Sequence, residues 1–250
     1  MGCCEKGSRL SKRFEKLGKS FIVYDNSVVP QMSEHFFDYA SWPDADAAPG
    51  YSGGRGATLF IEHEGDPWVL RHYHRGGQIG QLLKDGFLFM GGGRTRPMLE
   101  YDLLDWIYKQ GLPSPQPVAA RYVRRGLYYT ADLITRRLPQ VTPLSLRLAE
   151  GPLQTSIWTQ VGECVGQFHA ARVYHADLTA HNLQISDANK IYLLDFDRGR
   201  RMAGSGGWQN SNLSRLKRSF LKISEGNSIC FNEVCWGELM KGYRRVLGGN

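Results

Sequence analysis

Four polar residues in the second half of this 250-residue sequence carry its clearest chemical signal: His175, Asp177, Asn182 and Asp195. Asp177 and Asn182 stand five positions apart, and Asp195 directly follows the apolar run 191–194. Phosphoryl transfer needs a carboxylate that orients the attacking hydroxyl and accepts its proton, and oxygen ligands that hold Mg²⁺ against a triphosphate. The spacing therefore predicts a phosphotransferase that uses ATP and Mg²⁺, with Asp177 as catalytic base and Asn182 and Asp195 as metal ligands.

The pattern H-x-D-L-x-x-x-N, followed by an apolar strand that ends in D-F, resembles the catalytic loop and metal-binding motif of the protein-kinase superfamily. The sequence departs from that pattern at Ala176, where protein kinases usually have Arg, and at Asp197, where they have Gly. No Ala-Pro-Glu follows Asp195. These departures favour a kinase for a small molecule or a glycolipid over a regulated protein kinase.

A cluster of glycines lies upstream, before the strand predicted at 57–61. Glycine lets backbone N–H groups approach phosphates closely, so Gly53, Gly54 and Gly56 are candidates for a nucleotide-binding loop. Their spacing does not match G-x-G-x-x-G, and an ordinary hairpin turn is the alternative.

The strand predicted at 68–73 holds Arg71 where kinases have Lys. An Arg guanidinium can bind phosphate oxygens with two N–H groups, so a role at the α- and β-phosphates survives the exchange. Glu100, in the helix predicted at 95–110, is the expected ion-pair partner. The alternatives are a solvated strand residue and a surface glutamate.

These elements predict an α+β protein with a bilobal, protein-kinase-like fold. We expect a basic N-terminal segment at 1–20, an N-lobe with a small antiparallel sheet at 21–135, and a mainly helical C-lobe at 136–250. The apolar patterns place further strands at 20–29, 127–134, 183–185 and 191–194, a turn at Asp66-Pro67, and further helices at 33–39, 153–171, 212–223 and 232–246.

The composition limits the classes of partner and compartment. The chain has 31 basic and 24 acidic residues, for a net charge of +7. This charge favours an acidic partner such as a phosphate, an anionic membrane surface or nucleic acid, and ordinary surface charge is the alternative. Its five cysteines are scattered, with no zinc-site spacing, and no apolar run approaches the length of a membrane span. We therefore expect a protein of a reducing, cytoplasmic compartment.

The similarity becomes specific in three further stretches. They are Leu70-Arg71-His72-Tyr73-x-Arg75-Gly76-Gly77, Arg96-Pro97-x-x-Glu100-Tyr101-x-Leu103-Leu104 and Gly111-Leu112-Pro113-x-Pro115-x-Pro117-Val118-Ala119. Together with Tyr174–Asn182 and Asp195-Phe196-Asp197-Arg198-Gly199, they resemble bacterial Kdo kinase (3-deoxy-D-manno-octulosonic acid kinase) over about 24–247. The resemblance implies ATP-dependent phosphorylation of the Kdo 4-hydroxyl on the Kdo-bearing lipid A precursor, in lipopolysaccharide core assembly at the cytoplasmic face of the inner membrane.

The resemblance assigns the base to Asp177, the metal to Asn182 and Asp195, and nucleotide positioning to Arg71 and Glu100. A peripheral contact with the anionic membrane is expected. Its candidates are the basic N-terminal segment and the basic amphipathic helix at 212–223, whose alternatives are a disordered tail and packing against the lobe. Three arginines after the metal motif could meet the acceptor's acidic groups or form a solvated basic loop: Arg198, Arg200 and Arg201.

The two histidines of the loop also have expected roles. His175 should brace the loop through a backbone hydrogen bond, and His181 does the same or reaches the acceptor. Other acceptors stay open, namely a lipopolysaccharide heptose, a small molecule such as an antibiotic, or a protein Ser, Thr or Tyr. A pseudokinase is disfavoured by the intact Asp177, Asn182 and Asp195, and no nucleic-acid partner is expected because the sequence has no nucleic-acid motif.

Overall fold

The computed structural model describes residues 12–43, 45–47, 58–74, 86–204, 206–225 and 231–248. The chain divides into two compact units. Unit 1 comprises 1–101 and 116–137, and unit 2 comprises 102–115 and 138–250. This division differs from the expected single boundary after residue 135, because residues 102–115 fall in unit 2. The helix that was expected to belong wholly to the N-lobe thus contributes to both units.

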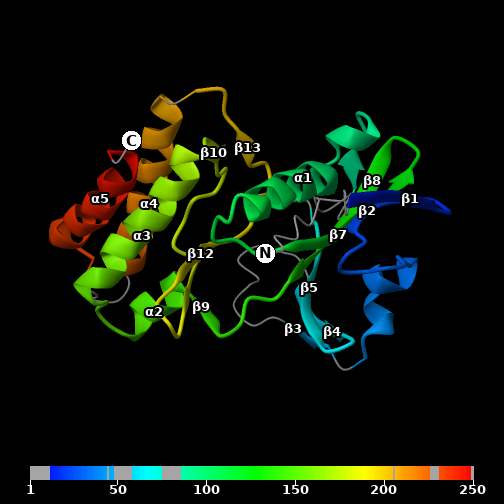
Figure 1. Cartoon of the computed structure of the whole chain (residues 1–250), viewed down its shortest axis with the longest axis horizontal. Helices are drawn as coiled ribbons and strands as arrows, with labels where there is room; N and C mark the ends of the chain where they lie inside the picture. The colour runs from blue at the N-terminus through cyan, green and yellow to red at the C-terminus, as the bar shows by residue number, and fades with distance from the viewer. Residues whose placement is uncertain are drawn as a thin grey trace, which may run out of the picture. The chain divides into compact units, whose positions relative to one another are not determined.

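Unit 1 is built on an antiparallel sheet, as the sequence predicted in outline, and the described residues contribute eight strands to it. Its order is β1-β2-β7-β8-β5-β4-β3, and β6 pairs with β8 (Figure 1). The strands are β1 (Lys12–Leu17), β2 (Ser20–Asp25), β3 (Asp46–Ala47), β4 (Thr58–His63), β5 (Asp66–His72), β6 (Phe87–Leu88), β7 (Pro117–Arg125) and β8 (Tyr128–Arg136). Short 3₁₀ helices cover Glu34–Phe37, Tyr39–Ser41 and Gly92–Arg94.

One apolar cluster of unit 1 lies on one face of this sheet. Apolar side chains from the central strands pack there against the first 3₁₀ helix, with Ile22, Trp68, Leu70, Val118 and Ile134 all at 1% exposure or less. Branched and aromatic side chains suit such a half-buried pleated surface. The sequence therefore sets the register of the strand that carries Arg71.

The turn predicted at Asp66-Pro67 is wrong, because the β4–β5 turn lies at Glu64-Gly65. Both turn residues have positive φ, 52° for Glu64 and 80° for Gly65, as a two-residue hairpin loop requires. Asp66 and Pro67 already belong to β5 and pair with His63 and Glu62.

Unit 2 is mainly helical. Its helices are α2 (Leu144–Glu150), α3 (Thr155–Ala170), α4 (Gly207–Glu225) and α5 (Glu233–Leu247), and α1 (Arg96–Lys109) runs from unit 1 into it. Figure 1 shows α3, α4 and α5 side by side. Its short strands are β9 (Val141–Pro143), β10 (Val173–Tyr174), β11 (Leu183–Ser186), β12 (Ile191–Leu193) and β13 (Arg200–Arg201).

Two glycines let α3 and α5 approach closely. A Cβ atom added to Gly162 would lie 1.9 Å from the Leu239 carbonyl oxygen, and one added to Gly242 would lie 2.0 Å from that of Thr159. Each helix thus presents a glycine to the backbone of the other. Any larger residue at either position would force the helices apart.

The structure describes α4 and part of the basic N-terminal segment, the two candidates for a membrane contact, and for α4 it matches the stated alternative of packing against the lobe. In α4, the apolar residues Leu213, Leu216 and Phe220 are buried within unit 2, so this face packs against the protein. Residues 12–17 of the basic segment form β1 and pair with β2. In the described part of the chain, no helix is long and apolar enough to cross a membrane.

Candidate active site

The loop that joins β10 to β11, residues 175–182, is anchored by the His175 ring. His175 Nδ1 accepts the backbone N–H of Asp177 at 3.2 Å, and Nε2 lies 2.8 Å from the Leu194 carbonyl oxygen, to which it donates. The ring is 2% exposed, and burial lowers its pKa, so it stays neutral with its proton on Nε2. The expected bracing role of His175 is confirmed.

The register of the β11–β12 hairpin brings the two expected metal ligands to the same end. Leu183 pairs with Leu193, so the residues just outside this pair, Asn182 and Leu194, face each other. The Leu194 N–H donates to the Asn182 carbonyl at 2.9 Å, while the Leu194 carbonyl accepts from His175. Both backbone groups of the residue before Asp195 are therefore held by the loop.

The Asn182 side chain is oriented by its own loop. Its Nδ2 donates to the Asp177 carbonyl at 2.8 Å, and its backbone N–H donates to the Thr179 carbonyl at 3.1 Å. Because the amide nitrogen is used in this way, the side-chain oxygen is the atom that remains as an acceptor.

The segment 195–199 has an anchored ring and an unusual backbone. Phe196 is fully buried, with its ring centroid 5.5 Å from that of Phe168 and 5.0 Å from that of His175. Asp195, which is exposed, has φ of +62°, a left-handed conformation that Asp tolerates better than most residues. Such conformations cluster at functional sites.

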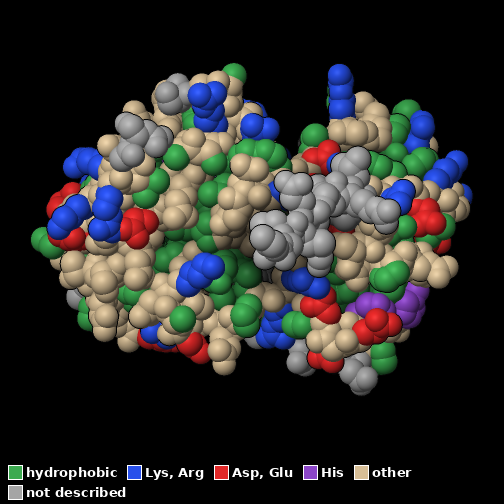
Figure 2. Space-filling view, in the orientation of Figure 1, with side chains coloured by type: hydrophobic (Ala, Val, Ile, Leu, Met, Phe, Trp, Pro, Cys, Tyr) green, Lys and Arg blue, Asp and Glu red, His purple; other side chains and the backbone are tan. Residues whose placement is uncertain are grey.

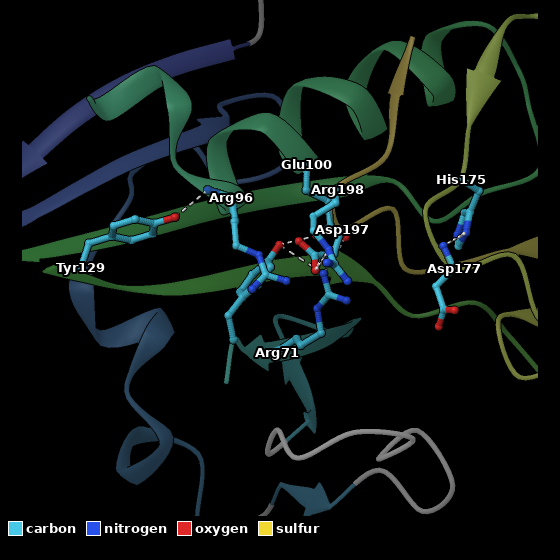
Figure 3. Close-up of polar contacts among 9 residues, drawn as sticks. Arg71, Arg96, Glu100, Tyr129, His175, Asp177, Asp197 and Arg198 are labelled. Carbon is cyan, nitrogen blue, oxygen red and sulfur yellow. Dashed lines mark hydrogen bonds and ion pairs between the residues drawn. The ribbon is translucent and has the colours of Figure 1, made fainter. Parts of the chain in front are cut away.

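The Asp177 carboxylate is open to solvent. Its side chain is 56% exposed and points away from His175 (Figure 3). Its Oδ1 accepts from Nη1 of Arg215 at 3.2 Å, and the Arg215 side chain is itself 45% exposed. The backbone of Asp177 is thus fixed by His175 and Asn182, while its carboxylate stays accessible to solvent.

Helix α4 holds the loop at two more points. Asn212, which is buried, donates from Nδ2 to the His175 carbonyl at 2.8 Å and accepts the His175 N–H at 3.3 Å. About two turns further along the same face of α4, the Ser219 hydroxyl accepts the Ala180 N–H at 3.1 Å. Asn212, Arg215 and Ser219 follow one another at helical spacing, so one face of α4 supports the loop.

His169 on α3 extends this network. Its Nε2 lies 3.4 Å from Asn212 Oδ1, and its Nδ1 lies 2.8 Å from the Tyr243 hydroxyl, so a neutral ring donates to the first and accepts from the second. Burial lowers the pKa of His169 to about 4 and raises that of Tyr243 to about 12.

A second cluster of sequence-predicted residues lies wholly within unit 1. Arg71 Nη2 lies 2.5 Å from Glu100 Oε1, which confirms the expected ion pair (Figure 3). The buried Tyr73 hydroxyl donates to the other Glu100 oxygen, and Arg71 also donates to Tyr73 at 3.2 Å. Burial and the Glu100 charge both raise the pKa of Tyr73, so its hydroxyl keeps its proton. The Glu100 side chain is only 1% exposed, against 24% for Arg71.

The remaining candidates are less informative. Gly53, Gly54 and Gly56 lie outside the described residues. Arg200 and Arg201 stack over the rings of Tyr174 and Trp106, at 5.1 and 4.1 Å, and Arg198 lies 3.8 Å from Asp197. Among the described residues, no group of three or more His, Cys, Asp or Glu side chains is placed to hold a metal ion.

Sequence reasoning missed His169, Asn212, Arg215 and Ser219.

The family described as "Lipopolysaccharide kinase (Kdo/WaaP) family" matches residues 40–243. A 3-deoxy-D-manno-octulosonic acid kinase of Vibrio parahaemolyticus is 38% identical over 201 residues, which cover 80% of this chain and 84% of the relative. One of Photobacterium damsela subsp. piscicida is 35% identical over 233 residues, covering 93% and 96%.

A third relative with the same description, from Xylella fastidiosa strain M12, is 38% identical over 208 residues, covering 83% of each chain. A solved structure of the bifunctional kinase-methyltransferase WbdD aligns with 83% of this chain and 47% of its own, at a TM-score of 0.48 and 14% identity. The family match and the relatives cover most of the chain. The chain therefore belongs to the lipopolysaccharide kinase (Kdo/WaaP) family.

Proposed function

We propose that this chain phosphorylates the 4-hydroxyl of Kdo on the Kdo-bearing lipid A precursor, with ATP as donor, in lipopolysaccharide core biosynthesis. The observation that carries the proposal is the loop geometry of unit 2. There, the residue before Asp195 is hydrogen-bonded to Asn182 and His175, while the Asp177 carboxylate faces solvent. In a chain of this family, that arrangement is the one phosphoryl transfer needs.

Asp177 is the general base of the proposed reaction. It accepts the proton of the acceptor hydroxyl as that oxygen forms its bond to the γ-phosphorus and the bond to the departing ADP oxygen breaks. Arg215 holds one carboxylate oxygen at 3.2 Å, which leaves the second oxygen for the acceptor. The neutral His175 acts through the backbone alone, because both of its nitrogens are engaged.

The oxygen atoms of Asn182 and Asp195 fit Mg²⁺. A Mg²⁺ ion in kinases takes one or two protein oxygens and completes its shell with waters and phosphate oxygens, so it needs no cage of acidic side chains. Asn182 would offer its side-chain oxygen, because its side-chain nitrogen already donates to the Asp177 carbonyl. When bound, the metal ion would neutralise charge on the phosphates of ATP.

Arg71 is proposed to bind the α- and β-phosphates. Glu100 and Tyr73 hold its guanidinium in one orientation, as a positioned cation requires. The glycines Gly53, Gly54 and Gly56 are proposed to contribute backbone N–H groups. We also propose the finer fold assignment, a bilobal protein-kinase-like fold, and a peripheral location at the cytoplasmic face of the inner membrane.

Product analysis tests the proposal. The purified chain is incubated with ATP, Mg²⁺ and the Kdo-bearing lipid A precursor, and the product is examined by NMR for a phosphate on the Kdo 4-hydroxyl. Parallel reactions contain a heptose-bearing core oligosaccharide or a generic protein substrate. Phosphate on Kdo alone is expected. Phosphate on heptose or on protein, with none on Kdo, would replace the proposed acceptor.

Metal dependence gives a separate test of Asp195. Replacing it by Asn removes the negative charge from a proposed Mg²⁺ ligand, so the Mg²⁺ concentration for half-maximal rate should rise about tenfold or more, of the order seen when metal-site contacts are lost. Asp187, an exposed turn residue, provides the matched Asp→Asn control. An unchanged Mg²⁺ dependence in Asp195→Asn would remove this residue from the metal site.

A further inference from the structure

One end of the unit 1 sheet gathers exposed apolar and basic side chains from separate strands. In the β7–β8 pairing Arg125 lies opposite Tyr128, and in the β6–β8 pairing Leu88 lies opposite the same Tyr128. Leu127 stands at the tip of the β7–β8 hairpin, and its carbonyl accepts the N–H of Phe89. Three neighbouring strands therefore end at one surface.

The turn between β1 and β2 lies at the same end. Leu17 pairs with Ser20, which in turn pairs with Val123 of β7, the residue before Arg124. The turn residue Lys19 is thus next to the β7–β8 hairpin. We call this region the hairpin-end surface; it comprises Lys16, Lys19, Leu88, Met90, Arg124, Arg125, Leu127 and Tyr128.

The apolar members of the hairpin-end surface are unusually open. Leu127 is 71% exposed, Met90 68%, Leu88 57% and Tyr128 37%. Single exposed apolar residues are common on proteins, but a cluster rimmed by polar groups marks an interaction site.

The charged members are all positive. The stretches 16–24, 86–99 and 117–131 contain no Asp or Glu. The Arg124 guanidinium stacks 4.4 Å over the Phe89 ring, and Lys16 Nζ lies 5.4 Å over the Phe21 ring. Aromatic rings therefore hold these cations, and within the described residues no carboxylate pairs with either. Figure 2 shows basic and hydrophobic side chains together at the upper right of the view, above the place where Figure 1 labels β1, with an acidic side chain lower down beside that label.

Exposed apolar side chains among unneutralised cations suit an anionic phospholipid surface. The cations are drawn to the negative headgroups, and the apolar side chains enter the boundary between headgroups and acyl chains. The amphipathic face of α4 does not compete for this role, because Leu213, Leu216 and Phe220 are buried in unit 2.

We propose that the hairpin-end surface docks the protein on an anionic lipid bilayer. The proposal deepens the membrane part of the proposed function and rests on it for the identity of the bilayer. It does not rest on the identity of the acceptor or on the phosphotransfer. Vesicle binding is measured without ATP or acceptor, so a failed transfer assay would leave the binding result intact.

The test is vesicle co-sedimentation of the full chain. The vesicles contain phosphatidylcholine alone or phosphatidylcholine mixed with phosphatidylglycerol. The charge variant is Arg124→Glu with Arg125→Glu, and the apolar variant is Leu127→Ser with Met90→Ser. The matched control is Arg218→Glu with Lys222→Glu, which makes the same change of net charge at exposed positions of α4. Circular dichroism and thermal melting establish that each variant is folded.

Wild type should bind the anionic vesicles and bind phosphatidylcholine alone weakly. The charge variant should lose at least about tenfold in affinity for anionic vesicles, because its two Arg→Glu replacements make the net charge of this surface four units more negative. The apolar variant should lose binding as well, while the α4 control stays near wild type. All hairpin variants should phosphorylate a de-acylated, water-soluble acceptor at the wild-type rate.

Two outcomes would overturn the proposal. Equal loss in the α4 control would mean that net charge, not this surface, drives binding. Wild-type vesicle binding by both hairpin variants would exclude the surface outright. If sedimentation velocity then showed a wild-type dimer that the apolar variant converts to a monomer, the surface would be an interface between two copies of this chain.

Discussion

Two carboxylate sites in this molecule are organised in opposite ways. In unit 1, the Glu100 side chain is buried and contacts Arg71 and Tyr73, so the side chains hold one another. In unit 2, the loop around Asp177 is held through its backbone, by His175, Asn182 and Asn212, and the carboxylate itself is 56% exposed. A cation that only positions phosphates benefits from rigid side-chain contacts. A base that must meet a proton needs a fixed backbone and an open carboxylate.

The largest expected effect comes from Asp177→Asn. Loss of the proposed general base should lower kcat by about 10³-fold. The thermal midpoint should stay near that of wild type, because the carboxylate is exposed and has one ion-pair partner at the surface. Steady-state kinetics and thermal melting measure the two quantities, with Asp187→Asn as the control. A large drop in the midpoint would show that Asp177 also holds the fold.

Glu100→Ala should have the opposite signature. It leaves the Arg71 and Tyr73 donors without their carboxylate in a buried place, which costs about 3 kcal/mol of unfolding free energy. Urea denaturation measures this loss. The control is Glu62→Ala, which changes an exposed glutamate of β4 and should change stability by less than about 0.5 kcal/mol. Equal small losses in both variants would contradict the structural role of Glu100.

The backbone supports of the Asp177 loop should make unit 2 sensitive to acid. The pKa of His169 is lowered to about 4, so between its ordinary value of 6.5 and about 4 the unfolded chain binds the proton that the folded chain refuses. Stability is therefore full above pH 6.5 and falls as the pH decreases through this window, by about 2 kcal/mol between pH 7 and pH 5.

The lowered pKa of His175 acts in the same direction. Urea denaturation of wild type and His169→Gln across this range checks the prediction. The variant should be less stable at pH 7 and lose less stability on acidification. A variant with the full wild-type slope would assign the acid sensitivity to other groups.

The smallest expected effect belongs to Arg215→Ala. An exposed ion pair contributes up to about 1 kcal/mol, so loss of this contact to Asp177 should lower kcat by about fivefold at most, with KM for ATP unchanged. The matched control is Arg218→Ala, which changes an exposed arginine three residues further along α4. A loss as large as that of Asp177→Asn would mean that Arg215 contacts the reacting groups.

The parts of the site that sequence could predict are the local ones. The spacing of Asp177, Asn182 and the strand before Asp195 identified a loop and a hairpin that the structure contains. The apolar period likewise predicted α1, α3, α4 and α5 within a few residues, although α4 begins five residues earlier than expected. Local pattern suffices where one short segment carries both the chemistry and the fold.

The parts that sequence missed depend on distant contacts. Asn212 and Arg215 reach the loop across 37 and 38 residues of chain, and no spacing rule links them to it. No strand was predicted at β7, and β1 lies in the segment predicted only as basic, because each becomes a strand through pairing with β2. Tertiary pairing decides such segments, and a single sequence does not display it.

The most direct test of the account measures single-turnover transfer of labelled phosphate from ATP to the lipid A precursor with and without Kdo, by wild type and by Asp177→Asn at saturating ATP. The account predicts labelled lipid only for wild type with the Kdo-bearing lipid. Equal labelling of the two lipids by wild type would contradict the acceptor, and full labelling by Asp177→Asn would contradict the catalytic base.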